Sequence, residues 1–261
     1  MGIQRAEHVL VATDFDGTLA PIVALPKMAR MAESDRQNLK AIVGNPEFSV
    51  AIVTGRRMEE IRRLVPVDGV YYAANYGMEI DGPNSFRFRE PTGERAQSLI
   101  ASLAFELDKA VSDIGGAVVE NKKLSITVHH RNVEPKWVSV VSQRVKALTD
   151  PGVSAGTIRV REGNRKAIEV VPTDTNDKGK AIGLILDRIS EVRARPWPIY
   201  LGDDVMDEGG FRVVNDHGGV SVLVENENPV ASQAQFSAAS TTEISQILGR
   251  IAAVSQGQPW R

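Results

Sequence analysis

The chain contains no cysteine and only four histidines among its 261 residues. The lack of cysteine excludes disulfide bonds and thiolate metal sites, so any bound metal must take oxygen or imidazole ligands. Four histidines leave little room for an imidazole cluster.

An excess of positive charge is also absent, since the chain has 31 basic and 33 acidic side chains and a formal net charge of -2. This balance differs from the basic footprint of a nucleic-acid-binding protein, so we expect no nucleic-acid partner. No apolar run reaches the roughly 18 residues of a membrane span, and the N-terminal sequence lacks the pattern of a signal peptide. We therefore expect a cytoplasmic protein with no membrane partner.

Hydrophobic residues make up 42% of the chain and charged residues 25%, which predicts an ordinary packed core. In both terminal parts, short apolar runs that end in turn residues alternate with helical segments. The runs predict strands at 9–12, 49–53, 70–74, 197–201 and 220–224. Helices are expected at 34–42, with Ser34 or Asp35 near the N-cap, and at 58–64, 178–189 and 240–253. This alternation is typical of a parallel sheet covered on both faces, so the fold class is α/β.

The middle of the chain has a different pattern. Apolar residues with helical spacing occupy 97–114, and strand pairs are expected at 117–120 with 124–130 and at 157–161 with 167–171. A further helix is expected at 137–148. The order helix-strand-strand, given twice, fits a small antiparallel sheet with helices on one face. We therefore expect an inserted module at 96–173 in a core formed by 1–95 and 174–261.

Two aspartates, Asp14 and Asp16, follow the first apolar run in the stretch VATDFDGTLA. A divalent cation such as Mg²⁺ prefers carboxylate oxygens and would screen their repulsion from a phosphate monoester. One carboxylate could then attack phosphorus, and the other could transfer protons to the leaving group and from water. Because Asp and Gly are also common turn formers, a plain turn is the alternative interpretation.

A second acidic cluster, GDDVMDE at 202–208, follows the apolar run at 197–201. Acidic residues are favourable at a helix N-terminus, so the cluster has an ordinary structural explanation. However, it is expected at the same edge of the sheet as Asp14. Two acidic loops that face each other are unfavourable without a cation between them, which favours a functional role.

Thr54 and Lys178 complete the set of candidate catalytic residues. Thr54, in VTGRR, could contact a phosphate together with a helix N-terminus, or could merely cap the helix that follows. Lys178 begins a predicted helix, where it could neutralise a phosphate in the transition state or could be a solvated surface lysine.

These four motifs, in this order, resemble those of the haloacid dehalogenase superfamily, whose members are mostly Mg²⁺-dependent phosphatases. The resemblance implies a Rossmann-like parallel-sheet core with an inserted, smaller α+β cap of order αββαββ. It implies that Asp14 is the nucleophile, Asp16 the acid and base, and that Thr54 and Lys178 contact phosphate.

The same resemblance implies a metal site that includes Asp203 and the backbone carbonyl of Asp16, while Asp204 and Asp207 support the metal or hold Lys178. The metal residues are thus Asp14, Asp16, Asp203, Asp204 and Asp207.

Charged residues of the middle module suggest how a neutral polyol could be held. Bidentate carboxylates and cationic donors satisfy many hydroxyl groups at once. Glu120, Lys122, Arg131 and Glu169 lie at or beside predicted strand ends and are the candidates. For Lys123 and His129, a solvated position on the sheet is the expected interpretation.

A narrower resemblance covers about 9–211. The segments DFDGTLAPI, E-x-K with HHR, IEVVP and YLGDD-x-x-DE-x-x-F are together similar to the trehalose-6-phosphate phosphatase family. The family pattern differs at two positions, since His130 stands where tyrosine is usual and Tyr76 where histidine is usual. The resemblance implies that Glu120, Lys122, Arg131 and Glu169 contact the sugar. We also expect Arg56, Asn75 and Tyr76 to line the seam between core and cap, and Gly55, Arg56 and Asn75 to contact the substrate.

The expected activity is therefore Mg²⁺-dependent hydrolysis of trehalose 6-phosphate through an aspartyl-phosphate, by a monomer whose partner is a small-molecule sugar phosphate. Other substrates remain open, namely sucrose, glucosylglycerol or mannosylglycerate phosphates. A sugar phosphomutase shares the paired-aspartate chemistry, and a non-catalytic regulatory module is a third alternative. Every acidic residue of the motifs is present, which disfavours the last of these.

Overall fold

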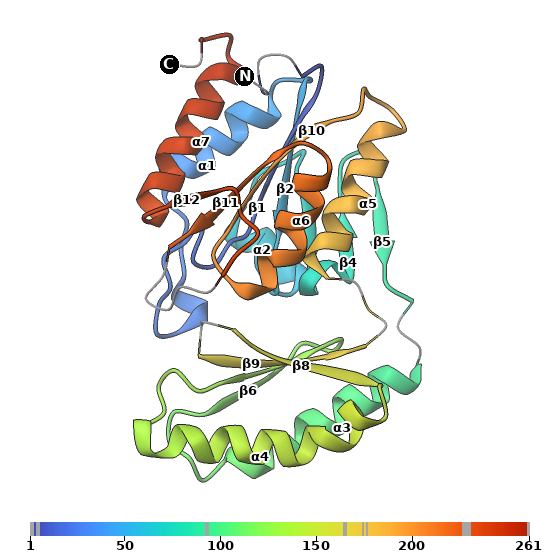
Figure 1. Ribbon diagram of the computed structural model, residues 1–261, viewed down its shortest axis with the longest axis vertical. Coiled ribbons are helices and arrows are strands. Elements are labelled where there is room, and N and C mark those ends of the chain that lie inside the picture. Colours follow the sequence, from blue (N-terminus) through green and yellow to red (C-terminus); the bar gives the residue numbers. More distant parts are fainter. Residues whose placement is uncertain are drawn as a thin grey trace. The chain divides into compact units, whose positions relative to one another are not determined.

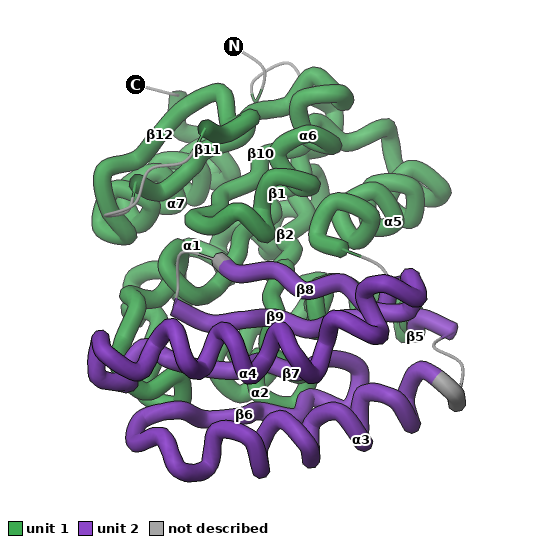
Figure 2. The backbone as a smooth tube through the Cα atoms, turned by 60° about the horizontal axis from the view of Figure 1, so that its bottom comes forward, with its two compact units in different colours: residues 1–89, 176–261 green, residues 90–175 purple. Residues whose placement is uncertain are grey.

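The computed structural model describes residues 3, 6–91, 94–163, 166–173, 175, 177–225 and 231–259. The chain divides into two compact units, residues 1–89 with 176–261 and residues 90–175 (Figure 2). The second unit begins a few residues before the expected start at 96. Residue 174, where the core was expected to resume, lies outside the described residues.

The first unit is built on an eight-stranded sheet in the order β12-β11-β10-β1-β2-β3-β4-β5 (Figure 1). Its parallel strands are β1 (Val9–Thr13), β2 (Phe48–Val53), β3 (Tyr71–Ala74), β10 (Trp197–Gly202), β11 (Val220–Val224) and β12 (Phe236–Ala238). Two short antiparallel strands, β4 (Glu79–Asp81) and β5 (Arg87–Arg89), extend the sheet at one edge. The predicted α/β fold with a parallel sheet is confirmed.

Helices cover both faces of this sheet. Successive residues of β1 alternate between two apolar clusters, Val9 and Val11 in one and Leu10 and Ala12 in the other. The first cluster includes residues of α1 (Glu33–Val43), α2 (Met58–Leu64) and α7 (Thr241–Ser255), and the second includes residues of α5 (Lys178–Ser190) and α6 (Glu208–Asp216). A strand buried on both faces needs apolar side chains at every position, which explains the continuous apolar runs of the sequence.

The start of α1 differs from the prediction. The N-cap is Ala32, which has no side chain to cap the helix, and neither Ser34 nor Asp35 takes that position. Asp35 is instead buried and accepts a hydrogen bond from Ser245 of α7. The tertiary contact between α1 and α7 therefore takes precedence over the local capping preference.

Several short elements gave no recognisable sequence signal. The strands β4, β5 and β12 have three residues each, and β5 carries two arginines at the edge of the sheet. Charged residues on a short edge strand are a common protection against unwanted strand pairing, and they remove the apolar run that would reveal the strand. The 3₁₀ turns Pro26–Met28, Asn75–Gly77 and Val205–Asp207 were also not predicted.

The second unit has the predicted order helix-strand-strand, repeated once. It consists of α3 (Glu94–Val111), β6 (Val118–Asn121), β7 (Ile126–His129), α4 (Pro135–Ser154), β8 (Ile158–Gly163) and β9 (Ala167–Pro172). The strands form an antiparallel sheet in the order β6-β7-β9-β8. Apolar residues of β7 and β9 pack with those of α3 and α4, so both helices cover one face of the sheet. The opposite face carries polar side chains.

No helix among the described residues has the length and apolar character needed to cross a membrane.

We expect two glycines of α5 to respond in opposite ways to substitution by alanine. A methyl group at Gly179 would lie 2.5 Å from the carbonyl oxygen of Gly209, where α5 and α6 meet, whereas a methyl group at Gly183 would meet no described atom within 4 Å. Gly179→Ala should lower the free energy of unfolding by about 1–3 kcal/mol through overpacking. Gly183→Ala should raise it by about 0.5–1 kcal/mol, because alanine is the better helix former. Urea denaturation measures both, and a loss of stability in both variants would contradict the packing argument.

Candidate active site

The carboxyl ends of the central parallel strands bring the predicted catalytic residues together. Asp14 follows β1, Thr54 follows β2 and Asp203 follows β10, while Lys178 is the first residue of α5. Strands β1 and β10 are neighbours, and the chain continues from β1 to β2 on one side and from β10 to β11 on the other, so the strand order switches direction between them. Ligands of open α/β sheets bind at such a switch point, outside the carboxyl ends of the strands.

Lys178 lies between two buried carboxylates. Its Nζ is 2.9 Å from Oδ2 of Asp14 and 2.6 Å from Oδ1 of Asp207, and all three side chains are at most 1% exposed. The backbone N–H of Phe15 donates to the other oxygen of Asp14 at 2.7 Å. Lys178 is therefore not the solvated lysine of the alternative interpretation, because its charge balances part of a buried acidic cluster.

Asp207 accepts hydrogen bonds at both of its carboxylate oxygens. Oδ1 accepts from Lys178 and from the hydroxyl of Tyr200, and Oδ2 accepts from the backbone N–H groups of Asp203 at 3.1 Å and Asp204 at 3.0 Å. Burial, together with the neighbouring aspartates, holds the pKa of Tyr200 well above its usual range, so the hydroxyl stays protonated and can donate. The resemblance implied that Asp207 either supports the metal or holds Lys178. The geometry favours the second role, because Asp207 accepts a hydrogen bond from Lys178.

Three buried carboxylates could share a cation. Oxygens of Asp14, Asp203 and Asp207 all lie within 4.8 Å of one another. The close approach of Asp203 depends on Gly17, whose φ is +78°, because a methyl group at this glycine would overlap the Asp203 carboxylate. An all-oxygen donor set with excess negative charge fits Mg²⁺. Among the described residues, the side chains of Asp16 and Asp204 do not join this group.

Asp204 instead stabilises the turn that follows. Its side chain accepts a hydrogen bond from the backbone N–H of Val205 at 2.6 Å and forms a capping box with Asp207 around the 3₁₀ turn Val205–Asp207. The aspartates of GDDVMDE therefore have different roles. Asp203 and Asp207 belong to the carboxylate cluster, while hydrogen bonds to Asp204 and Asp207 fix the loop that carries Asp203.

Asp16 is held by Arg56 through two parallel hydrogen bonds of 2.7 Å each. Arg56 is 6% exposed, and it also contacts the carboxylate of Glu60 and the carbonyl oxygen of Pro26. Burial acts against the charge of Arg56, but the two carboxylates outweigh it and the pKa of Arg56 is raised. The structure thus places Arg56, predicted to bind substrate, in contact with the predicted acid and base.

Thr54 does not cap helix α2, whose N-cap is Arg57. Its backbone N–H donates to Ala73 at 2.8 Å, and its carbonyl accepts from Tyr76 at 2.9 Å, so the residue is tied to the loop after β3. The alternative interpretation of Thr54 as a helix cap was therefore wrong. The Thr54 hydroxyl accepts from the backbone N–H of Arg56 at 3.3 Å.

Gly55 and Asn75 shape the same edge of the sheet. A methyl group at Gly55 would overlap the ring of Tyr76, so glycine is required for this close packing. The buried Asn75 has a φ of +47° and donates through Nδ2 to Glu79 at 2.7 Å. Asparagine tolerates this left-handed conformation better than most residues. The contacts of Gly55 and Asn75 therefore stabilise the loops that follow β2 and β3.

In the second unit, the predicted sugar-binding residues gather on the polar face of the sheet. Glu120 of β6 and Glu169 of β9 both pair with Thr127 of β7. The Nζ of Lys122 lies 3.8 Å from Oε1 of Glu169. Arg131 lies in the turn after β7 and is not part of the sheet.

Two polar residues of β7 were missed or misjudged by the sequence reasoning. His129, expected to be solvated, has its Nε2 3.1 Å from Oε2 of Glu120. The hydroxyl of Thr127, not singled out at all, lies within 2.9 Å of both carboxylate oxygens of Glu169. The alternation in LSITVHH places these two side chains on one face, and this period of two was the signal that could have revealed them.

His130, which stands where the family pattern has tyrosine, is buried in the same unit. Its Nε2 lies 3.2 Å from Oε1 of Glu162. Burial nevertheless lowers the pKa of His130, and the nearby Glu162 offsets this effect only in part. The ring is therefore expected to be neutral at pH 7.

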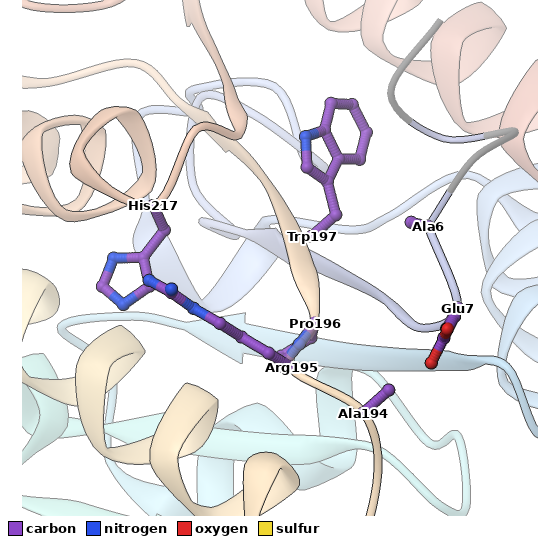
Figure 3. Close-up of a pocket in the computed structure, with 7 residues that line it drawn as sticks. All are labelled: Ala6, Glu7, Ala194, Arg195, Pro196, Trp197 and His217. Atoms are coloured by element: carbon purple, nitrogen blue, oxygen red, sulfur yellow. The ribbon is translucent and has the colours of Figure 1, made fainter.

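A cavity of about 530 Å³ occurs elsewhere in the first unit, lined by Ala6, Glu7, Ala194, Arg195, Pro196, Trp197 and His217 (Figure 3). Trp197 is the first residue of β10, whereas Asp203 follows its last residue. The cavity thus lies near the amino end of β10, whereas the acidic cluster lies at the carboxyl end. It does not form part of the candidate active site.

The sequence profile of the trehalose-phosphatase family matches residues 12–242. The chain belongs to this family. The probable trehalose-phosphate phosphatase D of Arabidopsis thaliana is 33% identical over 260 residues, which span 95% of this chain and 68% of that protein. The trehalose-phosphate phosphatase of Mycobacterium bovis is 30% identical over 259 residues, which span 98% of this chain and 64% of that protein.

Solved structures show the same fold as this trehalose-phosphatase family member. The C-terminal domain of the C. albicans trehalose-6-phosphate phosphatase has a TM-score of 0.83 at 20% identity, with 97% of this chain and 94% of that chain covered. The sucrose-phosphatase of Synechocystis has a TM-score of 0.55 at 17% identity, with 94% and 98% covered. The chain is thus a phosphoric monoester hydrolase with a haloacid dehalogenase fold, as predicted.

We expect the Tyr200 hydroxyl to stabilise the carboxylate cluster measurably. Tyr200→Phe removes a donor to the buried Asp207, so the free energy of unfolding should fall by about 1–3 kcal/mol. Tyr71→Phe is the matched control, because the Tyr71 hydroxyl makes no hydrogen bond in the described part of the chain. The control should change stability by less than about 0.5 kcal/mol. Equal effects in urea denaturation would argue against a special role for the Tyr200 contact.

Proposed function

We propose that this chain hydrolyses trehalose 6-phosphate to trehalose and phosphate, with Asp14 as the nucleophile. The observation that carries the proposal is the buried arrangement of Asp14, Lys178 and Asp203 at the end of β1. A nucleophilic carboxylate must approach a dianionic phosphate, which requires positive charge close by. Lys178 provides this charge, and Phe15 fixes the orientation of the Asp14 carboxylate. The family match supports this assignment of the substrate.

The reaction proceeds by two displacements at phosphorus. In the first, an oxygen of Asp14 bonds to phosphorus while the bond to the sugar oxygen breaks, and protonated Asp16 donates its proton to that oxygen. In the second, Asp16 takes a proton from water, whose oxygen bonds to phosphorus as the bond to Asp14 breaks. Asp14 is restored as a carboxylate, and the products are the sugar and inorganic phosphate.

Arg56 orients the side chain of Asp16. Two parallel hydrogen bonds from the guanidinium reach both carboxylate oxygens, so the plane of the Asp16 carboxylate is fixed. Arg56 therefore positions Asp16 for the proton transfers of both displacements.

We assign contacts with the phosphoryl group to Lys178 and Thr54. The ammonium group of Lys178 neutralises negative charge on the phosphoryl oxygens, and the hydrogen bond to Asp207 keeps it aimed at Asp14. Thr54, which directly follows β2, offers its hydroxyl to a phosphoryl oxygen. We assign the Mg²⁺ ligands to the carboxylates of Asp14 and Asp203 and to the backbone carbonyl of Asp16. When bound, the ion screens the charge of the phosphate and orients it.

We assign residues 90–175 as the domain that selects the sugar. Its polar sheet face carries Glu120, Lys122 and Glu169 side by side, a combination of acceptors and a donor suited to neighbouring hydroxyl groups. Arg131 lies in the adjacent turn and adds a cationic donor. A disaccharide has many hydroxyl groups and no charge of its own, so its recognition depends on such hydrogen bonds.

The test is phosphate release from a panel of sugar monophosphates, with Mg²⁺ present or removed by EDTA. We expect trehalose 6-phosphate to be cleaved with the highest kcat/KM, above sucrose, glucosylglycerol and mannosylglycerate phosphates, and EDTA to abolish release. No bisphosphate activator should be needed, which separates hydrolysis from mutase chemistry. Cleavage of another sugar phosphate but not of trehalose 6-phosphate would overturn the substrate while leaving the mechanism in place.

Asp14→Asn tests the nucleophile. The variant keeps the size and burial of the side chain but cannot form the aspartyl-phosphate, so kcat should fall by about 10³-fold or more. Thermal unfolding should confirm that the variant is folded. A folded Asp14→Asn variant with near-normal turnover would refute the proposed mechanism.

A further inference from the structure

Strand β7 occupies a special position in the sheet of the second unit. It pairs with β6 on one side and with β9 on the other, and the register aligns Glu120, Thr127 and Glu169 in one row across the three strands. Residues that are directly opposite in a sheet have their Cβ atoms about 4.5–5.5 Å apart, so their side chains interact directly. Thr127 is therefore flanked by the two glutamates proposed to bind the sugar.

The hydroxyl of Thr127 is directed at Glu169. Its Oγ1 lies 2.9 Å from Oε1 and 2.8 Å from Oε2 of that carboxylate, and Thr127 is only 1% exposed. In the described part of the chain this hydroxyl makes no other hydrogen bond, and the carboxylate of Glu169 accepts none from any other donor. A buried threonine often satisfies its hydroxyl on a nearby backbone carbonyl, and Thr127 does not do so.

Lys122 alone is not sufficient to fix the orientation of Glu169. Its Nζ is 3.8 Å from Oε1, which is an ion-pair distance but too long for a hydrogen bond. An ammonium group acts as a compact point charge on a flexible stem and sets little direction. Threonine, in contrast, is restricted at χ1 because it is branched at Cβ, so it presents its hydroxyl from a rigid position on the strand.

We propose that Thr127 is a positioning residue for sugar specificity, which holds the Glu169 carboxylate in the orientation that receives the hydroxyl groups of the substrate. The inference rests on the proposed function, since it takes Glu169 as a sugar ligand. The single hydroxyl proton of Thr127 uses one of about four acceptor sites on the carboxylate. Both oxygens of Glu169 therefore keep capacity for neighbouring substrate hydroxyls while their plane is fixed.

The experiment compares a sugar substrate with one that has no sugar. Thr127→Val keeps the shape of the side chain and removes the hydroxyl, and Thr127→Ser keeps the hydroxyl. We expect Thr127→Val to raise the KM for trehalose 6-phosphate about tenfold, as for the loss of a charge-assisted hydrogen bond, with kcat changed less than KM. Thr127→Ser should restore most of the affinity. With p-nitrophenyl phosphate, which has no hydroxyl groups for Glu169 to bind, both variants should match the wild type within about twofold.

Two controls separate positioning from a structural effect. Ser125→Ala removes another buried hydroxyl just before β7, one that has no hydrogen-bond partner in the described structure, and it should leave both substrates unaffected. Glu169→Ala should raise the KM for the sugar substrate, and adding Thr127→Val to it should cause no further rise, because Thr127 acts through Glu169. Thermal unfolding of each variant verifies that it is folded.

Each result either supports or overturns the inference. An unchanged KM for trehalose 6-phosphate in Thr127→Val would overturn it, as would equal losses on both substrates or additive effects with Glu169→Ala. If the wild type does not cleave trehalose 6-phosphate at all, the proposed function fails instead. If Glu169→Ala is impaired with the sugar while Thr127→Val is normal, the proposed function stands and only the role of Thr127 is refuted.

Discussion

The ion pair of Lys178 with Asp14 and Asp207 is the interaction on which the rest of the site depends. Fully buried carboxylates are costly unless they are paired, and the Lys178 ammonium lies within 3 Å of both. Removing one partner of such a group would leave an uncompensated charge, which is far more costly than never burying the pair. The excess of negative charge that remains around Asp203 is what makes the cluster suited to a dication.

The parallel sheet supplies the rigidity that this arrangement needs. Asp14 and Asp203 follow adjacent strands, β1 and β10, whose residues are paired in register from Val9 with Trp197 to Thr13 with Leu201. The separation of the two loops is therefore fixed by the backbone hydrogen bonds of the sheet. Gly17 then permits the final close approach of Asp203, so a residue without a side chain determines the geometry of two charged ones.

The sequence predicts those parts of the site that depend on strand ends, and it fails where side chains meet across the fold. Apolar runs locate the ends of β1, β2 and β10, which is enough to bring Asp14, Thr54 and Asp203 to one edge. The bidentate contact of Arg56 with Asp16 joins residues 40 positions apart, and no local pattern signals it. Short strands such as β4 and β5 are not predicted from the sequence for a related reason. Their formation depends on pairing with neighbouring strands and not on an apolar run of their own.

The two units solve the problem of holding a carboxylate in different ways. In the first unit, Lys178 and backbone N–H groups surround fully buried aspartates, an arrangement suited to chemistry that needs concentrated charge. In the second unit, Glu169 is held by the neutral hydroxyl of Thr127, with Lys122 at a longer distance. A neutral donor fixes direction without cancelling the charge of its partner. Glu169 thus keeps its strength as an acceptor, which is the property that its proposed role in binding an uncharged sugar requires.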